Sequence, residues 1–187
     1  MSLESFFNPQ SIAIVGASRQ KSKVGYEILA NIVKAGYKGG IFPVNPNTDT
    51  IEGLKCYPDL ESIPDTPDLV IIIVPAKIVP PVMQQCAKVG VKSVIIITAG
   101  FREVGEEGRA LEKQVVQIAK QAGIRVIGPN CLGLIVPANK LNASFGGDLP
   151  AAGAIAYLSQ SGALLAIFYN SGYKMNTEFD GEVYNIT

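Results

Sequence analysis

The chain has 187 residues, of which 48% are hydrophobic and 17% charged, and its formal net charge is zero. This length accommodates one full domain and part of a second, and the composition predicts a folded globular protein rather than a disordered one. At zero net charge, binding to nucleic acid or to a membrane surface through bulk charge is not expected. No stretch approaches the roughly 20 apolar residues of a membrane-spanning helix, and the first residues lack the pattern of a secretory signal.

The cysteine and histidine content limits the chemistry. Three widely spaced cysteines occur, Cys56, Cys86 and Cys131, and the chain contains no histidine. This pattern predicts reduced thiols in a cytoplasmic protein and argues against a disulfide framework or a cysteine-rich zinc site, so no metal is expected. A mechanism that needs an imidazole base or a phosphohistidine therefore requires a histidine from outside the chain.

Short β-branched runs alternate with helical patterns along the chain. The expected strands are Ser11–Val15, Gly40–Val44, Asp68–Val74, Ser93–Ile97 and Arg125–Ile127. The expected helices are Val24–Ala35, one whose face runs from Val79 to Gly90, and Glu106–Gln121. Strands joined by helices of this length form parallel βαβ units with right-handed crossovers. We therefore expect an α/β fold with a Rossmann-like, doubly wound parallel sheet and a ligand crevice at the carboxyl ends of its strands.

The last third of the chain has a different pattern. Residues 1–133 contain all the units above and form one expected domain. Residues 134–152 have no clear helix and several Gly, Pro and Asn residues, which is typical of a linker or a small hairpin. A strand expected at Gly153–Leu158 and the turn that follows it then predict the first βα unit of a second, truncated domain over residues 153–187.

The turn after the first expected strand carries the densest local charge. Residues Gly16–Gly25 are GASRQKSKVG, with basic side chains at Arg19, Lys21 and Lys23. A turn between a strand and a helix presents backbone N–H groups and the positive end of the helix, which suit a phosphate. The loop is longer and more basic than a G-x-G-x-x-G turn, which favours a ligand with more phosphate than a dinucleotide. The alternative is an ordinary turn with solvated lysines.

The second expected strand ends without an acidic residue. A dinucleotide-binding enzyme usually places Asp or Glu there to hold the ribose hydroxyls. Here the strand is followed by Asn45, Pro46 and Asn47, and the first carboxylate is Asp49. A nicotinamide cofactor is therefore disfavoured and remains an alternative.

Four further loops follow expected strands and should face the same crevice. They are Val74-Pro75-Ala76, Thr98-Ala99-Gly100-Phe101, Gly128–Gly133 and Ser159-Gln160-Ser161-Gly162. The alternative for the first two is ordinary turn chemistry. For Cys131 a small apolar thiol near a ligand is favoured over a nucleophile, because no histidine can activate it. Ser159 or Ser161 can cap a helix, a role worth about 1 kcal/mol that is compatible with phosphate binding.

Seven motifs then occur in a defined order. They are Ile14–Ser18 (IVGAS), Pro43–Pro46 (PVNP), Gly53–Leu60 (GLKCYPDL), Asp68–Pro75 (DLVIIIVP), Ile97–Phe101 (ITAGF), Gly128–Gly133 (GPNCLG) and Leu158–Leu164 (LSQSGAL). Together they resemble the CoA-binding domain of NDP-forming acyl-CoA synthetases, relatives of the succinyl-CoA synthetase α subunit. Each motif alone is weakly specific, but all seven are in register. The resemblance implies a CoA-binding domain over residues 1–133 and the start of a flavodoxin-like domain after residue 152.

The resemblance also implies a role for each loop. The implied CoA-binding residues are Gly16, Ala17, Ser18, Arg19, Lys21, Lys23, Gly25, Asn45, Pro46, Val74, Pro75, Ile97, Thr98, Ala99, Asn130 and Cys131, and the implied phosphate-binding residues are Ser159, Ser161 and Gly162. The loop Gly16–Gly25 would hold the pyrophosphate region of CoA. The loops at Val74-Pro75 and Ile97–Ala99 would line the adenosine and pantetheine path. The pair Asn130-Cys131 would lie near the thioester.

In such enzymes an acid, CoA and a nucleoside triphosphate interconvert with acyl-CoA, a nucleoside diphosphate and phosphate, through an acyl phosphate and a phosphohistidine. This chain departs from the pattern at Asn47, where many members have Lys, and residues 165–187 do not align. We therefore expect no catalytic residue in this chain and a partner, an ATP-grasp domain or β subunit, supplied elsewhere. Alternatives are a stand-alone CoA-binding or regulatory protein, disfavoured by the motif Leu158–Leu164, an NAD(P)-binding oxidoreductase domain, and a ligase-like arrangement fused to an acetyltransferase.

Overall fold

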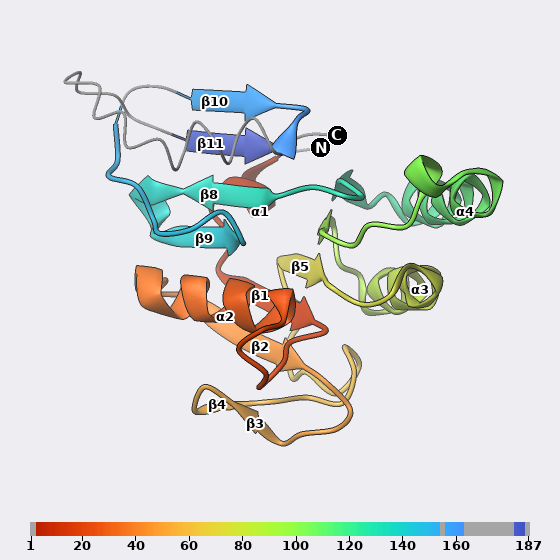
Figure 1. The fold of residues 1–187 in the computed structure, drawn as a ribbon. Helices are drawn as coiled ribbons and strands as arrows, with labels where there is room; N and C mark the ends of the chain where they lie inside the picture. The colour runs from red at the N-terminus through yellow and green to blue at the C-terminus, as the bar shows by residue number, and fades with distance from the viewer. Residues whose placement is uncertain (1–2, 154–155, 163–181, 186–187) are drawn as a thin grey trace.

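The structure, a computed structural model, describes residues 3–153, 156–162 and 182–185 (Figure 1). In chain order its strands are β1 Ser11–Val15, β2 Gly40–Val44, β3 Thr50–Ile51, β4 Leu54–Lys55, β5 Leu69–Ile72, β6 Ser93–Ile96, β7 Arg125–Ile127, β8 Gly133–Val136, β9 Leu141–Ser144, β10 Ala156–Ser159 and β11 Glu182–Asn185. The α-helices are α1 Glu4–Phe7, α2 Val24–Ala35, α3 Val79–Val89 and α4 Glu106–Ala122, and the 3-10 helices are η1 Ala76–Ile78, η2 Arg102–Val104 and η3 Pro137–Asn139.

A five-stranded parallel sheet lies at the centre, in the order β2-β1-β5-β6-β7. Because successive strand residues point to opposite faces, each strand contributes to two separate cores. Ile14 of β1 and Ile71 of β5 belong to one core, whereas Val15 and Ile72 belong to the other. Both faces are covered, which explains why these strands are continuous hydrophobic runs. The predicted Rossmann-like α/β fold is confirmed.

The helices divide between the two faces of this sheet. Figure 1 shows α2 on one side and the pair α3 and α4 on the other. Ile28 and Ile32 of α2 pack into the first core, and Met83 of α3 and Val115 of α4 pack into the second. The strand order reverses between β1 and β5, and at such a switch point the neighbouring loops diverge to opposite faces and leave a crevice. The predicted helix boundaries hold, because α2, α3 and α4 each end at a left-handed glycine, with α4 reaching Ala122.

In residues 134–152 the structure has a hairpin, which is the alternative to the expected linker. Strands β8 and β9 pair antiparallel, and their apolar side chains, among them Leu134 and Leu141, are fully buried in the core that α2 also fills. The hairpin extends into a second sheet in the order β10-β11-β8-β9 (Figure 1). Sequence patterning did not define the two strands or their burial, because β8 is apolar on both faces and so lacks the alternation of a half-buried strand. The division of the chain into domains stays a prediction.

Smaller corrections concern strand ends and one missed element. The strand expected at Asp68–Val74 spans only Leu69–Ile72, because the Asp68 carboxylate accepts the Gln10 N–H and the Val74 carbonyl accepts the Thr98 hydroxyl. The strand expected at Ser93–Ile97 ends at Ile96, and that expected at Gly153–Leu158 is Ala156–Ser159. The short pair β3-β4, between β2 and β5, was not predicted, since each strand has only two residues.

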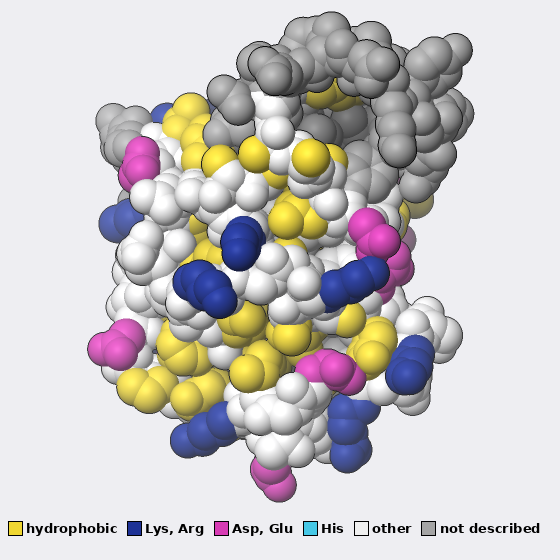
Figure 2. Space-filling view, turned by 90° about the vertical axis from the view of Figure 1, so that its left-hand side faces the viewer, with side chains coloured by type: hydrophobic (Ala, Val, Ile, Leu, Met, Phe, Trp, Pro, Cys, Tyr) yellow, Lys and Arg dark blue, Asp and Glu magenta, His cyan; other side chains and the backbone are white. Residues whose placement is uncertain are grey.

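The surface carries both signs of charge. Figure 2 shows the face on the left of Figure 1, where Lys and Arg side chains alternate with Asp and Glu around a band of hydrophobic side chains. Interspersed charges of this kind create no large field of one sign. Within the ranges the structure describes, no helix is both long and apolar enough to cross a bilayer.

The burial of the hairpin yields a stability prediction. We expect Leu141→Ala to lower the free energy of unfolding by about 2–5 kcal/mol, because it removes a fully buried side chain from the core beneath α2. Val33→Ala, on the exposed side of α2, should change it by less than about 0.5 kcal/mol. Urea unfolding followed by circular dichroism measures both. Equal small effects would mean that the hairpin is only a covering segment.

Candidate functional site

Neighbouring loops at the carboxyl edge of the sheet are joined by hydrogen bonds. Beside β1 and β2, the Gly16 N–H donates to the Val44 carbonyl at 3.1 Å, and the Asn45 side-chain amide donates to the Ala17 carbonyl at 2.8 Å. The amide of Asn45 is therefore engaged in holding the first turn. An acid at this position would be unable to donate that bond.

The same arrangement continues across β5, β6 and β7. The Thr98 hydroxyl donates to the Val74 carbonyl at 2.7 Å, and the Asn130 N–H donates to the Thr98 carbonyl at 2.9 Å. Asn130 has a positive φ of 56°, in the left-handed region, and the Gly128–Pro129 bond before it is cis. Five of the loops predicted to carry the chemistry are thus linked in two groups, one beside β1 and β2 and one beside β5, β6 and β7.

The first turn and the start of α2 lie unusually close together. A Cβ built on Gly25 would lie 2.1 Å from the Gly16 carbonyl oxygen, and one on Gly16 would lie 2.4 Å from the Ile73 carbonyl oxygen. Gly16 also has a φ of 94°, which other residues rarely adopt. Lys23, at the N-cap of α2, makes no side-chain capping hydrogen bond. Only glycines allow this approach, which brings the positive end of α2 to the carboxyl edge.

The basic side chains of this turn project away from the fold. Arg19, Lys21 and Lys23 are all exposed. The Ser18 hydroxyl is engaged locally, since it accepts the Gln20 N–H at 3.0 Å. These side chains therefore lie at the rim, where they can meet an anionic ligand in solvent.

A cleft of about 780 Å³ opens at the carboxyl ends of β5, β6 and β7. It is lined by Val24, Ile73, Ile97, Thr98, Ala99, Arg102, Glu103, Glu112, Pro129, Asn130, Cys131, Leu132, Phe145, Gln160 and Gly162. Its size is that of a small-molecule site, and a few polar groups stand among apolar ones. The predicted crevice at the carboxyl edge is therefore present.

The cleft brings together some of the predicted residues and leaves others at its margins. Ile97, Thr98, Ala99, Asn130, Cys131 and Gly162 line it. Gly16, Ala17, Ser18, Arg19, Lys21, Lys23, Gly25, Asn45, Pro46, Val74, Pro75, Ser159 and Ser161 do not line it. The Ser159 hydroxyl accepts the Ser161 N–H and donates to the Ser161 carbonyl, both at 3.1 Å, so it already serves a turn. The helix expected to follow lies outside the described residues beyond Gly162.

Cys131 has the environment of a packed thiol. Its Sγ is buried and donates to the Ile96 carbonyl at 3.3 Å. Burial raises the pKa of the Cys131 thiol to about 12, so the thiolate is scarce at neutral pH. Burial and the bond to the Ile96 carbonyl favour a packing role for this thiol over a nucleophilic one.

Several lining residues were not singled out from the sequence. Glu103 and Glu112 enter the cleft from η2 and α4, and Phe145 enters from the end of β9. Glu103 lies two residues after the Ile97–Phe101 motif, in the same loop, so its place near the crevice follows from that of the motif. No sequence pattern pointed to Phe145, because its position depends on how the hairpin β8-β9 packs against the rest of the fold.

Glu103 stabilises the loop after β6 from within. Its Oε1 accepts the Gly100 N–H at 2.6 Å. Partial burial raises the pKa of Glu103, but hydrogen bonds from the backbone of Gly100, Glu103 and Phe101 and the charge of Arg102 outweigh it, so the pKa is lowered. The carboxylate is thus an exposed anion whose bonds to the backbone hold the loop in shape.

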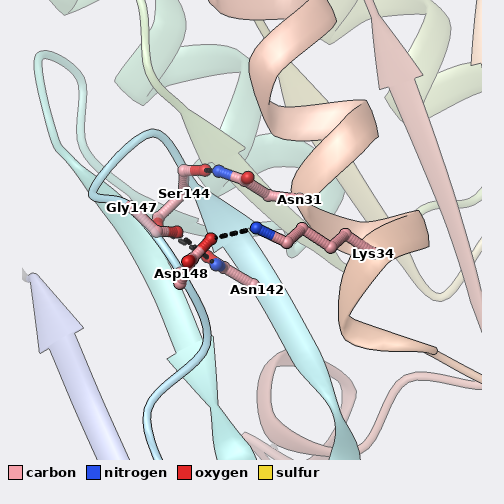
Figure 3. A network of polar contacts seen from close by, with 6 residues as sticks. All are labelled: Asn31, Lys34, Asn142, Ser144, Gly147 and Asp148. Carbon is pink, nitrogen blue, oxygen red and sulfur yellow. Dashed lines mark hydrogen bonds and ion pairs between the residues drawn. The ribbon is translucent and has the colours of Figure 1, made fainter.

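A polar network attaches the loop after β9 to α2 (Figure 3). The Asn31 amide donates to the Ser144 carbonyl at 2.9 Å, and Lys34 forms an ion pair with Asp148. The Asn142 amide donates to the Gly147 carbonyl at 2.8 Å. These contacts join the helix that begins at the first turn to the loop that carries Phe145.

Comparison with known proteins shows which family the chain belongs to. Residues 10–137, more than half of it, match the family model described as CoA binding domain. The chain belongs to this family of CoA-binding domains. The resemblance carried by the seven motifs is thereby confirmed.

Curated relatives of this CoA-binding domain are much longer proteins. The α subunit of ADP-forming acetate–CoA ligase I from Pyrococcus furiosus is 46% identical over 168 residues, which cover 88% of this chain and 36% of the relative. The ADP-forming 4-hydroxybutyrate–CoA ligase from Nitrosopumilus maritimus is 44% identical over 161 residues, which cover 85% of this chain and 23% of the relative. The chain thus spans well under half the length of either.

A solved structure is similar over nearly the whole chain. It is the dinucleotide-forming acetyl-coenzyme A synthetase 1 of Ca. Korarchaeum cryptofilum in complex with phosphate and ADP. The two align with a TM-score of 0.93 and 40% identity, over 99% of this chain and 39% of that one.

The close approach at the first turn predicts the effect of a methyl group. Gly16→Ala and Gly90→Ala both place alanine in a left-handed conformation, which costs about 1–2 kcal/mol. Only Gly16→Ala also drives a Cβ into a backbone carbonyl, whereas nothing lies within 4 Å at Gly90. We expect Gly16→Ala to lower the free energy of unfolding by about 1–3 kcal/mol more than Gly90→Ala does. Equal losses of unfolding free energy for the two variants in denaturant titrations would show that the turn can shift to accommodate the added methyl group.

The depressed pKa of Glu103 predicts a pH dependence. The carboxylate contributes stability above its ordinary pKa of 4.5, and this contribution is lost as the pH falls through the lower pKa of the folded state. The difference in unfolding free energy between wild type and Glu103→Gln should therefore shrink from about pH 6 to about pH 3. Asp65→Asn, an exposed loop carboxylate, is the control. A pH-independent difference for Glu103→Gln would contradict this origin.

Proposed function

We propose that this chain is the CoA-binding portion of an NDP-forming acyl-CoA synthetase. In that reaction an acid, CoA and a nucleoside triphosphate give acyl-CoA, a nucleoside diphosphate and phosphate. The observation that carries the proposal is the cleft at the carboxyl ends of β5, β6 and β7, lined by loops of a CoA-binding domain. The proposal extends to both CoA and acyl-CoA as ligands.

The phosphate end of CoA would occupy the first turn. The N-terminus of α2 offers backbone N–H groups and a positive dipole, and the close packing of Gly16 against Gly25 keeps side chains out of the way. Arg19, Lys21 and Lys23 are exposed beside it and would supply charge for the pyrophosphate and the 3′-phosphate. Such rim charges contribute through attraction that salt weakens.

The pantetheine arm would follow the cleft toward Asn130 and Cys131. Thr98 and Ala99 line the path and are held by the bonds between neighbouring loops. The thioester would then lie beside the buried Cys131 thiol, which supplies volume rather than chemistry. The turn Ser159–Gly162 would receive the phosphoryl group, since Gly162 reaches the same cleft.

The chemical step needs groups that this sequence does not contain. The chain has no histidine, so a phosphohistidine relay requires a residue from another part of the enzyme. We therefore propose that an ATP-grasp domain or β subunit and the catalytic histidine act together with this chain. The relatives are named for acetate and for 4-hydroxybutyrate, which makes CoA the shared substrate and the acid the variable one.

The proposal predicts that CoA binds in preference to NAD. We expect a CoA dissociation constant on the order of 10 μM to 1 mM by titration calorimetry. NAD should bind more weakly, since Asn45 stands where a ribose-binding acid would be needed and its amide is engaged with Ala17. Tighter binding of NAD would contradict the proposal and favour an oxidoreductase domain.

Removing the basic side chains of the first turn tests whether they contact the phosphates of CoA. The triple variant Arg19→Ala, Lys21→Ala, Lys23→Ala should weaken CoA more than dephospho-CoA, and added salt should weaken wild-type binding of CoA. Equal losses for the two ligands would show that these side chains do not contact the 3′-phosphate.

A further inference from the structure

Phe145 stands out among the residues of the cleft. Its side chain is 36% exposed, whereas Phe6 and Phe101 are completely buried or nearly so. A single exposed aromatic on an open surface is ordinary. Phe145 instead lines a concave site, together with Val24, which is 37% exposed. This wall of the cleft therefore offers apolar surface to a ligand.

The residues on both sides of Phe145 are held in place. Ser144 is 1% exposed, and its carbonyl accepts the Asn31 amide while its hydroxyl donates to Asn142 at 2.7 Å. The Gly146 N–H donates back to the Ser144 hydroxyl at 3.2 Å. Figure 3 shows Asn31 reaching across from α2 to Ser144. Because the loop is already ordered, a ligand that contacts Phe145 need not order it on binding.

The position of Phe145 along the cleft follows from its neighbours. A Cβ on Gly146 would lie 3.3 Å from Cδ2 of Leu132, so the loop rests against the residue that follows Cys131. Phe145, Leu132 and Cys131 line the same cleft. Under the proposed function this is the end that holds the thioester.

We propose that Phe145 is a specificity-determining residue that limits the length of the acyl group carried by CoA, and that Asn31 is a positioning residue that holds it through Ser144. This inference rests on the proposed function. An apolar wall discriminates between acyl groups by the methylenes it admits, and one methylene typically changes selection by roughly 10- to 200-fold. The discrimination needs a wall that does not move, which the contacts of Ser144 and Gly146 provide.

The test compares ligands that differ only in the acyl chain. Dissociation constants of CoA, acetyl-CoA, butyryl-CoA and hexanoyl-CoA are measured by calorimetry on the whole chain, with saturation-transfer NMR reporting contact with the acyl protons. Wild type should bind hexanoyl-CoA more weakly than acetyl-CoA. Phe145→Ala should shift that ratio toward hexanoyl-CoA by about tenfold and leave CoA itself within about twofold.

Asn31 is tested with an isosteric change. Asn31→Asp keeps the size of the side chain but removes the N–H that the Ser144 carbonyl accepts. It should shift the acyl-chain ratio in the same direction as Phe145→Ala, by a smaller factor. A merely structural role would instead weaken CoA and every acyl-CoA equally. Val116→Ala, an exposed apolar residue on α4 outside this cleft, should change no ratio.

The outcomes separate this inference from the function on which it rests. If wild type binds no CoA, the proposed function fails and the inference fails with it. If CoA binds but Phe145→Ala leaves the acyl-chain ratio unchanged, the inference alone is wrong. If Phe145→Ala weakens CoA and adenosine 3′,5′-bisphosphate together, the ring contacts adenine, which also overturns the acyl assignment. Circular dichroism of each variant shows that it is folded.

Discussion

The structure depends on hydrogen bonds between neighbouring loops at the carboxyl edge of the sheet, one group beside β1 and β2 and another beside β5, β6 and β7. The strands alone determine the direction in which each loop leaves the sheet, but not where the side chains of the loop lie. The bonds from Asn45 to Ala17, from Thr98 to Val74 and from Asn130 to Thr98 supply that placement. They also satisfy polar groups that would otherwise be costly beside a buried sheet. The result is two groups of linked loops, built from segments far apart in the sequence, on either side of the switch point between β1 and β5.

Covering both faces of the sheet makes this arrangement possible. One face is covered by α3, α4 and the segment that carries Tyr57, Leu60 and Ile63, whereas the other is covered by α2 and the hairpin β8-β9. The hairpin therefore has two roles, because its apolar side chains complete a core and its final loop forms a wall of the cleft. Packing of the hairpin in the core stabilises the loop that carries Phe145, which is itself outside the buried core. This coupling explains how an apolar side chain can be left available to a ligand.

The charged groups of the site also lie in different places. The apolar wall of Val24, Ile73 and Phe145 is accompanied by the charged groups Glu103 and Arg102. Backbone N–H groups and Arg102 lower the pKa of Glu103, so its carboxylate stays ionised and, with Glu112, places negative charge in this part of the cleft. The exposed basic residues lie instead at the first turn, before α2. Under the proposed function, attraction of the CoA phosphates and selection of the acyl group would occur in different parts of the site.

Local pattern was enough to predict the parallel sheet, α2, α3 and α4, and the turns that follow each strand, because strand and helix periodicities and terminal glycines act over a few residues. It also placed Ile97–Ala99, Asn130 and Cys131 at one crevice, since the carboxyl ends of parallel strands must meet at one edge. Only the tertiary structure decided that residues 133–144 form a buried hairpin and that Phe145 and Glu112 reach the cleft. Those placements depend on contacts between segments distant in sequence, such as Asn31 with Ser144, which no local pattern encodes.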